Sequence, residues 1–183
     1  MQRINALDPA KASVESQAML EAVQNQLGVV PNLFKTVAHS PAALKFYLMQ
    51  MEALASGVLP ASIREQIALA TAGANNSDYC ASAHTVLGGE CGVDANEAAS
   101  SLRGHSASPK IEAALNFAKA IIEHKGNVGD AQLKAVRDAG YSEAELVEII
   151  ANVAMNIFTN YFNLVAGTEI DFPHIHTGIV RAA

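Results

Sequence analysis

Signals that begin α-helices recur along the whole of this 183-residue chain. Ser40–Pro41 and Ser108–Pro109 each pair an N-cap residue with a proline in the first turn, where a helix tolerates proline. Ser142 followed by Glu145 has the spacing of a capping box, in which each side chain bonds the backbone N–H of the other residue. Between these signals, apolar residues recur at intervals of three and four, and no segment alternates convincingly with period two. The sequence therefore predicts an all-α fold.

The bounds of the predicted helices follow from these signals and from the residues that end helices. Ser62 with Glu65 suggests a further capping box, and Ser77 is expected to cap a helix that ends near Gly88–Gly89. The tail from Asp171 is expected to be irregular. No linker divides the chain, so residues 1–183 are predicted to form a single domain, long enough to bury a core. The expected helices are 14–27, a short one within 31–39, 41–56, 62–74, 77–89, a short one from 94, 109–124, 130–140 and 142–167.

Composition and charge limit the classes of partner. The chain has 18 acidic and 12 basic residues, and its Lys and Arg residues form no cluster, so we expect no nucleic-acid partner. Half of the residues are hydrophobic and only 16% are charged. That excess of apolar residues favours a subunit interface.

The longest stretch without charge, residues 149–168, contains four asparagines that would be costly in lipid. We therefore expect a buried helix and no membrane span. The N-terminus lacks the apolar core of a signal peptide, and two cysteines make no disulfide framework. A cytoplasmic location, where thiols stay reduced, is the expectation.

Cys80, His84 and Glu65 are the candidate catalytic residues. In the first turn of a helix, free N–H groups and the helix dipole would lower the pKa of the Cys80 thiol. His84 lies one turn further on the same face, and Glu65 can hold the far nitrogen of its ring if the two helices pack side by side. A thiolate produced in this way is a candidate for redox or peroxide chemistry.

Each of these residues also has a structural interpretation. Most free cysteines are buried and inert, Glu65 can complete the capping box with Ser62, and His84 can be a core histidine. Tyr79 either walls the pocket, with its hydroxyl available to a substrate, or packs in the core.

Four asparagines and three further histidines are the other polar candidates for the site. His39 is a candidate for approaching the pocket. His174 and His176 offer too few ligands for a metal site, so we expect solvent-exposed histidines and no metal. The asparagines of the last helix either line the pocket or, more in keeping with buried polar groups, hydrogen-bond across a helix or subunit contact: Asn152, Asn156, Asn160 and Asn163.

The run around Cys80 resembles the signature of the alkylhydroperoxidase D-like, carboxymuconolactone decarboxylase-like superfamily. Its peroxidase branch has a glutamate, eleven residues, Cys-x-x-Cys, three residues and a histidine; Glu65, Cys80 and His84 match the glutamate, the second cysteine and the histidine. The resemblance covers most of the chain and implies a helical bundle of the alkylhydroperoxidase D-like type, an obligate homo-oligomer, either a trimer or a hexamer. Segments similar to the peroxidase-related subgroup are 31–34, 38–41, 160–163 and 171–173.

Ser77 replaces the first cysteine of that motif, either naturally or as an engineered change. In the family, the first cysteine of the motif forms a disulfide with the second cysteine, and a partner later reduces this disulfide. Serine cannot form this bond, but it can cap the helix and donate a hydrogen bond to a Cys80 thiolate.

The expected activity is reduction of an organic hydroperoxide without a metal or organic cofactor. Cys80 attacks the outer oxygen and becomes a sulfenic acid, and His84, supported by Glu65, protonates the leaving oxygen. Recovery needs a thiol, and Cys91 is the only internal candidate. Cys91 more plausibly packs as a small apolar residue, which favours an external thiol reductant.

Two other functions remain open. One is a cofactor-free lyase of the carboxymuconolactone decarboxylase type, a branch that generally lacks the reactive cysteine. The other is a non-catalytic helical oligomer that binds a ligand or a partner.

Overall fold

The computed structural model describes residues 2–178, and every regular element in this range is helical. This confirms the all-α prediction. The tail from Asp171 to Gly178 is irregular, as expected. The elements are η1 (Pro9–Lys11), α1 (Val14–Leu27), α2 (Asn32–Val37), α3 (Pro41–Ala55), α4 (Ala61–Asn75), α5 (Asp78–Glu90), α6 (Ala95–Ser101), α7 (Pro109–Glu123), α8 (Asp130–Asp138) and α9 (Glu143–Ala166).

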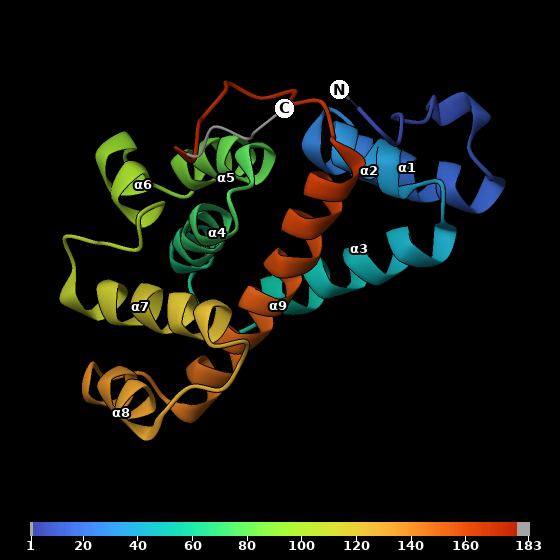
Figure 1. The fold of residues 1–183 in the computed structure, drawn as a ribbon. Helices are drawn as coiled ribbons and strands as arrows, with labels where there is room; N and C mark the ends of the chain where they lie inside the picture. Colours follow the sequence, from blue (N-terminus) through green and yellow to red (C-terminus); the bar gives the residue numbers. More distant parts are fainter. Residues whose placement is uncertain (1, 179–183) are drawn as a thin grey trace.

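The long helix α9 crosses the middle of the molecule (Figure 1). Its start is the predicted capping box: the Ser142 hydroxyl accepts from the Glu145 N–H at 3.2 Å, and the Glu145 carboxylate accepts from the Ser142 N–H at 2.7 Å. It ends before Gly167, whose φ of 60° is a left-handed conformation that glycine adopts without strain.

By length and composition, α9 is apolar enough to cross a membrane. Its packing is instead that of a core helix, because it contacts α3, α4, α5 and α7. Its asparagines 152, 156, 160 and 163 are all buried within the protein.

Two apolar clusters lie on either side of α9. One joins α1, α2 and α3 to the first turns of α5, and the other joins α4, α7, α8 and α9. Figure 1 shows the same division, with α1–α3 on one side of α9 and α4–α8 on the other. The first turns of α5 therefore lie where the α1–α3 layer meets the rest of the molecule.

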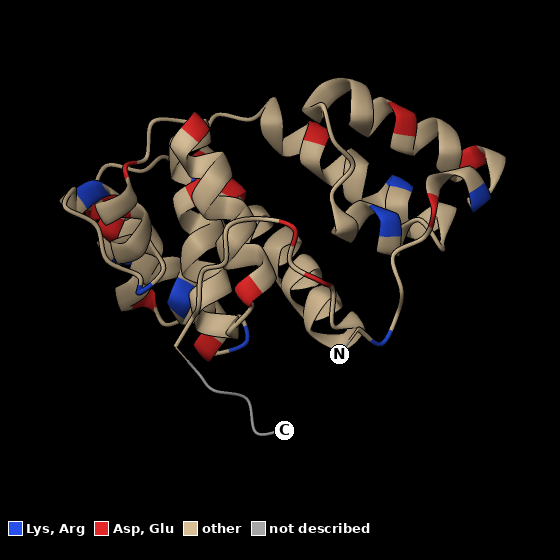
Figure 2. Cartoon of the chain, turned by 90° about the horizontal axis from the view of Figure 1, so that it is seen from above, with Lys and Arg blue, Asp and Glu red and all other residues tan. Residues whose placement is uncertain are grey.

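Charged residues are sparse and spread over the helices (Figure 2). Several of them are fixed in local pairs, such as Arg137 with Glu143, whose Nε and Oε1 atoms are 2.7 Å apart. In the view of Figure 2, Lys and Arg do not gather over any one helix.

One predicted helix cap is wrong, and the end of α5 lies one residue beyond the predicted range. Helix α4 begins at Ala61 after Pro60, so Ser62 is inside the helix and forms no capping box with Glu65. Helix α5 continues through Gly88–Gly89 to Glu90. The left-handed residue that follows the helix is Gly92, with φ of 84°.

The Cys80 pocket as candidate active site

Helices α4 and α5 pack side by side and bring Glu65 to His84. The Glu65 Oε2 and His84 Nδ1 atoms are 2.7 Å apart, and their side chains are 20% and 15% exposed. A carboxylate can only accept, so Nδ1 of a neutral imidazole must donate this hydrogen bond. Nε2 is then the nitrogen that can take a proton, which is the orientation a general base needs.

Cys80 is the third residue of α5 and is 2% exposed. Two side chains from α9 contact its sulfur. The Asn163 Nδ2 group donates to Sγ at 3.3 Å, and the Cys80 thiol points to the Thr159 Oγ1 atom at 3.9 Å. The sulfur is therefore held between two helices that are distant in sequence.

The expected lowering of the Cys80 pKa is not found. Burial raises the pKa of this thiol and outweighs the polar side chains around the sulfur, those of Ser77, Asn163, Thr159 and Asn160, which lower it. No hydrogen bond joins the sulfur to His84 within residues 2–178. The resting residue is thus a buried neutral thiol near a base, and it becomes reactive only if its proton is removed.

Cys80, His84 and Glu65 line one cavity of about 560 Å³. Its other walls come mainly from the α1–α3 layer and from α5, with Phe172 added from the C-terminal tail, and most of them are apolar. Such a cavity favours an apolar ligand of moderate size. The apolar lining residues are Leu27, Val29, Pro31, Leu33, Phe34, Met51, Ala83, Val86, Leu87 and Phe172.

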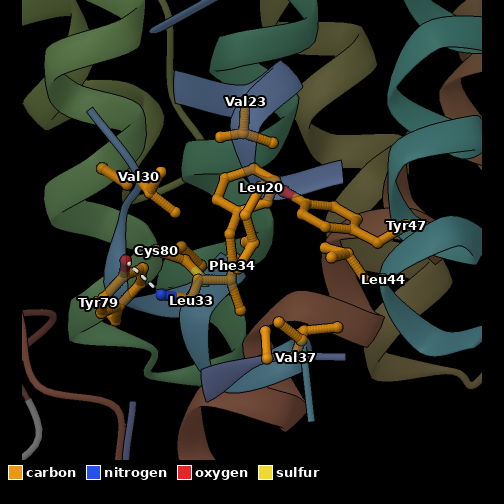
Figure 3. Close-up of a cluster of buried hydrophobic side chains, with 14 of the residues drawn as sticks. Leu20, Val23, Val30, Leu33, Phe34, Val37, Leu44, Tyr47, Tyr79 and Cys80 are labelled. Atoms are coloured by element: carbon orange, nitrogen blue, oxygen red, sulfur yellow. Dashed lines mark hydrogen bonds between the residues drawn. The ribbon is translucent and has the colours of Figure 1, made fainter. Parts of the chain in front are cut away.

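Tyr79 lines the cavity with its ring, but its hydroxyl is already engaged. It accepts from the Leu33 N–H at 3.0 Å and donates to Asp171 Oδ1 at 2.9 Å. Figure 3 shows the first of these bonds beside Cys80 and Phe34. Burial raises the pKa of this phenol. Tyr79 therefore fastens α2 and the tail to α5, and its hydroxyl is not available to a substrate.

Ser77 occupies the N-cap position of α5, but its side chain makes no capping hydrogen bond. Its buried hydroxyl has no hydrogen-bond partner among the described residues, although it lies close enough to Cys80 to lower the pKa of the thiol. Ser77 and Asn163 also line a polar recess of about 380 Å³, separate from the apolar cavity. Position 77 thus lies between this recess and the reactive sulfur.

Cys91 lies at the opposite end of α5 and is exposed, so the expectation that it packs as a small apolar residue is wrong. Because an α-helix rises about 1.5 Å per residue, the two cysteines are separated by roughly 16 Å along the axis. A disulfide needs Cα atoms within about 7 Å. Internal resolution by Cys91, the less favoured alternative, therefore does not fit this fold, because α5 does not break at Gly88–Gly89 and cannot fold back.

The remaining polar candidates, His39 and the asparagines of α9, differ in their contacts. His39 Nε2 contacts the backbone oxygen of Asn5 at 3.0 Å and is not among the cavity residues, so its expected approach to the pocket is wrong. The Asn152 and Asn156 side chains donate to backbone oxygens one turn earlier in α9. Asn163 instead bonds the Cys80 sulfur, although it lines the separate polar recess and not the Cys80 cavity.

Two pocket residues, Thr159 and Tyr47, are absent from the sequence-based set. Thr159 lies one position before Asn160 in the polar stripe, and extending that stripe would have found it. Tyr47 comes from α3 and is buried, which raises the pKa of its phenol, and the nearby Cys80 and Glu65 raise it further. No sequence pattern pointed to Tyr47, because only the packing of α3 against α9 brings it to the cavity.

Comparison with known proteins finds one matching family and several solved structures with the same fold. Residues 40–123 match the model of the carboxymuconolactone decarboxylase family. A solved alkylhydroperoxidase AhpD core, an uncharacterized peroxidase-related protein from Ralstonia eutropha JMP134, is 25% identical with a TM-score of 0.85, over 93% of this chain and 92% of that one. Among curated protein sequences, none matches the chain.

Two further structures share the fold. An uncharacterized peroxidase-related protein from Silicibacter sp. TM1040 has a TM-score of 0.79 at 22% identity, over 92% of each chain. The debrominase Bmp8, solved as a variant in complex with 2,3,4-tribromopyrrole, has a TM-score of 0.78 at 19% identity, over 92% of this chain and 91% of that one. The family match over residues 40–123 and the shared fold together support the alkylhydroperoxidase D-like, carboxymuconolactone decarboxylase-like superfamily for this chain.

Proposed function

We propose that this protein is a thiol-dependent peroxidase that reduces apolar organic hydroperoxides through Cys80. The observation that carries the proposal is the single apolar cavity that is lined by both a cysteine and a carboxylate-bound imidazole. The structural likeness to peroxidase-related proteins supports the same class of reaction.

In the oxidation step, the Cys80 proton passes to His84 Nε2, with the bound hydroperoxide or a water bridging the two groups. The sulfur then attacks the outer peroxide oxygen, an S–O bond forms and the O–O bond breaks. His84 returns the proton to the departing alkoxide, which leaves as an alcohol. Glu65 stabilises the imidazolium that exists between these transfers.

Recovery of the thiol uses an external reductant, because Cys91 is out of reach. A first small thiol attacks the sulfenic sulfur, so that an S–S bond forms and the oxygen leaves as water. A second thiol molecule then displaces Cys80 and leaves as a disulfide, which restores the starting protein.

The apolar walls of the cavity predict selectivity among hydroperoxides. Cumene hydroperoxide can bury an aromatic ring against side chains such as Phe34 and Phe172, whereas hydrogen peroxide cannot. We expect the second-order rate constant for cumene hydroperoxide to exceed that for hydrogen peroxide at least tenfold, which corresponds to about 1.4 kcal/mol.

The experiment that tests the proposal is thiol-dependent consumption of cumene hydroperoxide by the purified chain. Cys80→Ser should abolish it, and the matched control Cys91→Ser should retain it, because Cys91 is exposed and outside the cavity. Equal consumption by the unaltered protein and Cys80→Ser would rule out peroxide reduction through Cys80.

A second candidate is thiol-dependent debromination of an aromatic ring, favoured by the structural likeness to Bmp8 and by the apolar cavity. Carbon–bromine bonds would be exchanged for carbon–hydrogen bonds, with bromide released and two thiols supplying the electrons as they form a disulfide. Release of bromide from 2,3,4-tribromopyrrole, compared between the unaltered chain and Cys80→Ser, distinguishes this activity from peroxide reduction.

We also propose that the chain works as a homo-oligomer, as the resemblance implies. Exposed apolar residues of α9 form one stripe, because positions 147, 150, 154, 161 and 165 fall within about 60° when each residue turns by about 100°. Phe46 of α3 extends the stripe through an edge-on ring contact of 5.4 Å with Phe158. A stripe of this kind is typical of an interface between copies.

A further inference from the structure

Three side chains with metal-binding atoms converge outside the Cys80 cavity. Asp78 is the first residue of α5, whereas His174 and His176 lie in the C-terminal tail. The Asp78 Oδ2 atom lies 3.4 Å from His176 Nδ1 and 3.7 Å from His174 Nε2. One ligand atom from each of the three residues lies within 4.8 Å of the others.

The tail is fastened to α5 in a way that orients this group. The Thr177 N–H and hydroxyl both donate to Asp78 Oδ1, at 2.9 Å and 2.7 Å, and the Ile175 N–H donates to the Ser82 hydroxyl at 2.9 Å. One carboxylate oxygen is thereby occupied, and the other faces the two imidazoles. Hydrogen bonds to the second oxygen of a ligating carboxylate are a regular feature of metal sites.

We propose that Asp78, His174 and His176 bind one divalent transition-metal ion, with Zn²⁺ as the best match. Zinc takes imidazole nitrogen and carboxylate oxygen at about 2.0–2.2 Å, so tetrahedral ligand atoms lie roughly 3.4 Å apart. The two distances from Asp78 Oδ2 already fit that spacing. Three protein ligands leave a fourth position for water.

The surroundings set the expected strength of the site. The N-terminus of α5 carries the positive end of the helix dipole, and Arg3 lines the recess that Asp78 and His174 share, so both disfavour a cation. The imidazoles are largely exposed and lose little hydration on binding. We therefore expect a dissociation constant on the order of micromolar rather than nanomolar.

A bound ion would tie the tail to the helix that carries Cys80. Phe172, in the same tail, walls the apolar cavity and packs edge-on against Tyr79 with ring centroids 5.8 Å apart. Fixing His174 and His176 to Asp78 would hold this wall in place. The ion is structural in this account and takes no part in the chemistry of the thiol, so the inference stands independently of the proposed function.

Calorimetric titration of the full chain, without an affinity tag and stripped with EDTA, tests the site with Zn²⁺ alone. We expect one equivalent to bind, and His174→Ala and His176→Ala each to weaken binding at least tenfold. Substitution of Co²⁺ should give visible absorption bands that the same variants lose. His124→Ala is the matched control, because His124 is exposed and lies outside the cluster.

Hydrogen exchange supplies a readout of the tail itself. Zinc should slow exchange of the amides of residues 174–177 in the unaltered chain and in His124→Ala, but not in His174→Ala. Stoichiometric zinc binding that survives both His174→Ala and His176→Ala would place the ion elsewhere and overturn the proposal, as would the absence of binding at millimolar zinc.

Discussion

At the scale of single residues, Cys80 is a buried neutral thiol, and the nearby base His84 makes no direct hydrogen bond to its sulfur. Its sulfur is held by Asn163, while the nearby His84 is held by Glu65. This separation means that the thiol is protected until a ligand bridges it to the imidazole. Reactivity should therefore depend on what occupies the cavity.

Alkylation measures this protection. Because burial raises the pKa of Cys80 and shields its sulfur, iodoacetamide should modify Cys80 at least tenfold more slowly than the exposed Cys91 at neutral pH. Mass spectrometry of both peptides, with EDTA present, checks the ratio. Faster alkylation of Cys80 than of Cys91 would mean that the thiol is already ionised.

Glu65 acts through His84 rather than on the substrate. Glu65→Gln removes the negative charge that stabilises the imidazolium, and we expect a roughly tenfold slower peroxide reaction, against about 100-fold for His84→Ala. Glu112→Gln is the matched control, because Glu112 makes an exposed pair with His105 at 2.9 Å. Equal rates for Glu65→Gln and Glu112→Gln would remove Glu65 from the mechanism.

At the scale of elements, the site depends on close packing of α4. A Cβ atom added at Gly73 would lie 1.8 Å from the backbone oxygen of Leu102, which follows α6. Gly73→Ala should therefore lower the free energy of unfolding by about 2 kcal/mol or more. Gly89→Ala in α5, with open space around it, should be neutral or stabilising by up to about 1 kcal/mol. Urea unfolding of the two variants checks both signs.

The elements themselves were predictable where the signal is local. The caps at Ser40, Ser108 and Ser142 lie within one turn of the helices that they begin, so these starts could be read from the chain. Glu65 shows that a local pattern alone can suggest the wrong partner for a side chain. Its spacing from Ser62 fits a capping box, but the packing of α5 against α4 gives its carboxylate a different partner.

The same limit applies to the candidate site. The pairing of Glu65 with His84 could be expected, because helical spacing and one packing contact suffice for it. The raised pKa of Cys80 could not, because it depends on burial by α2, α3 and α9, which are distant in sequence. Likewise, the convergence of His174 and His176 on Asp78 requires the path of the tail across α5.

At the scale of the whole molecule, the α9 stripe predicts how the chain assembles. Ile150→Glu together with Val165→Glu places charge at the proposed contact and should shift the particle mass to that of one chain. Val14→Glu is the control, because Val14 is also exposed and apolar but lies on α1. Light scattering after size exclusion measures the mass. An unchanged mass for the double variant would move the interface to another face.

The most direct test of the account is a single turnover with cumene hydroperoxide, with dimedone present to trap sulfenic acid. The account predicts a dimedone adduct on Cys80, formed at least tenfold more slowly in His84→Ala. Consumption of the hydroperoxide with Cys80 left unmodified, or with an adduct only on Cys91, would contradict it.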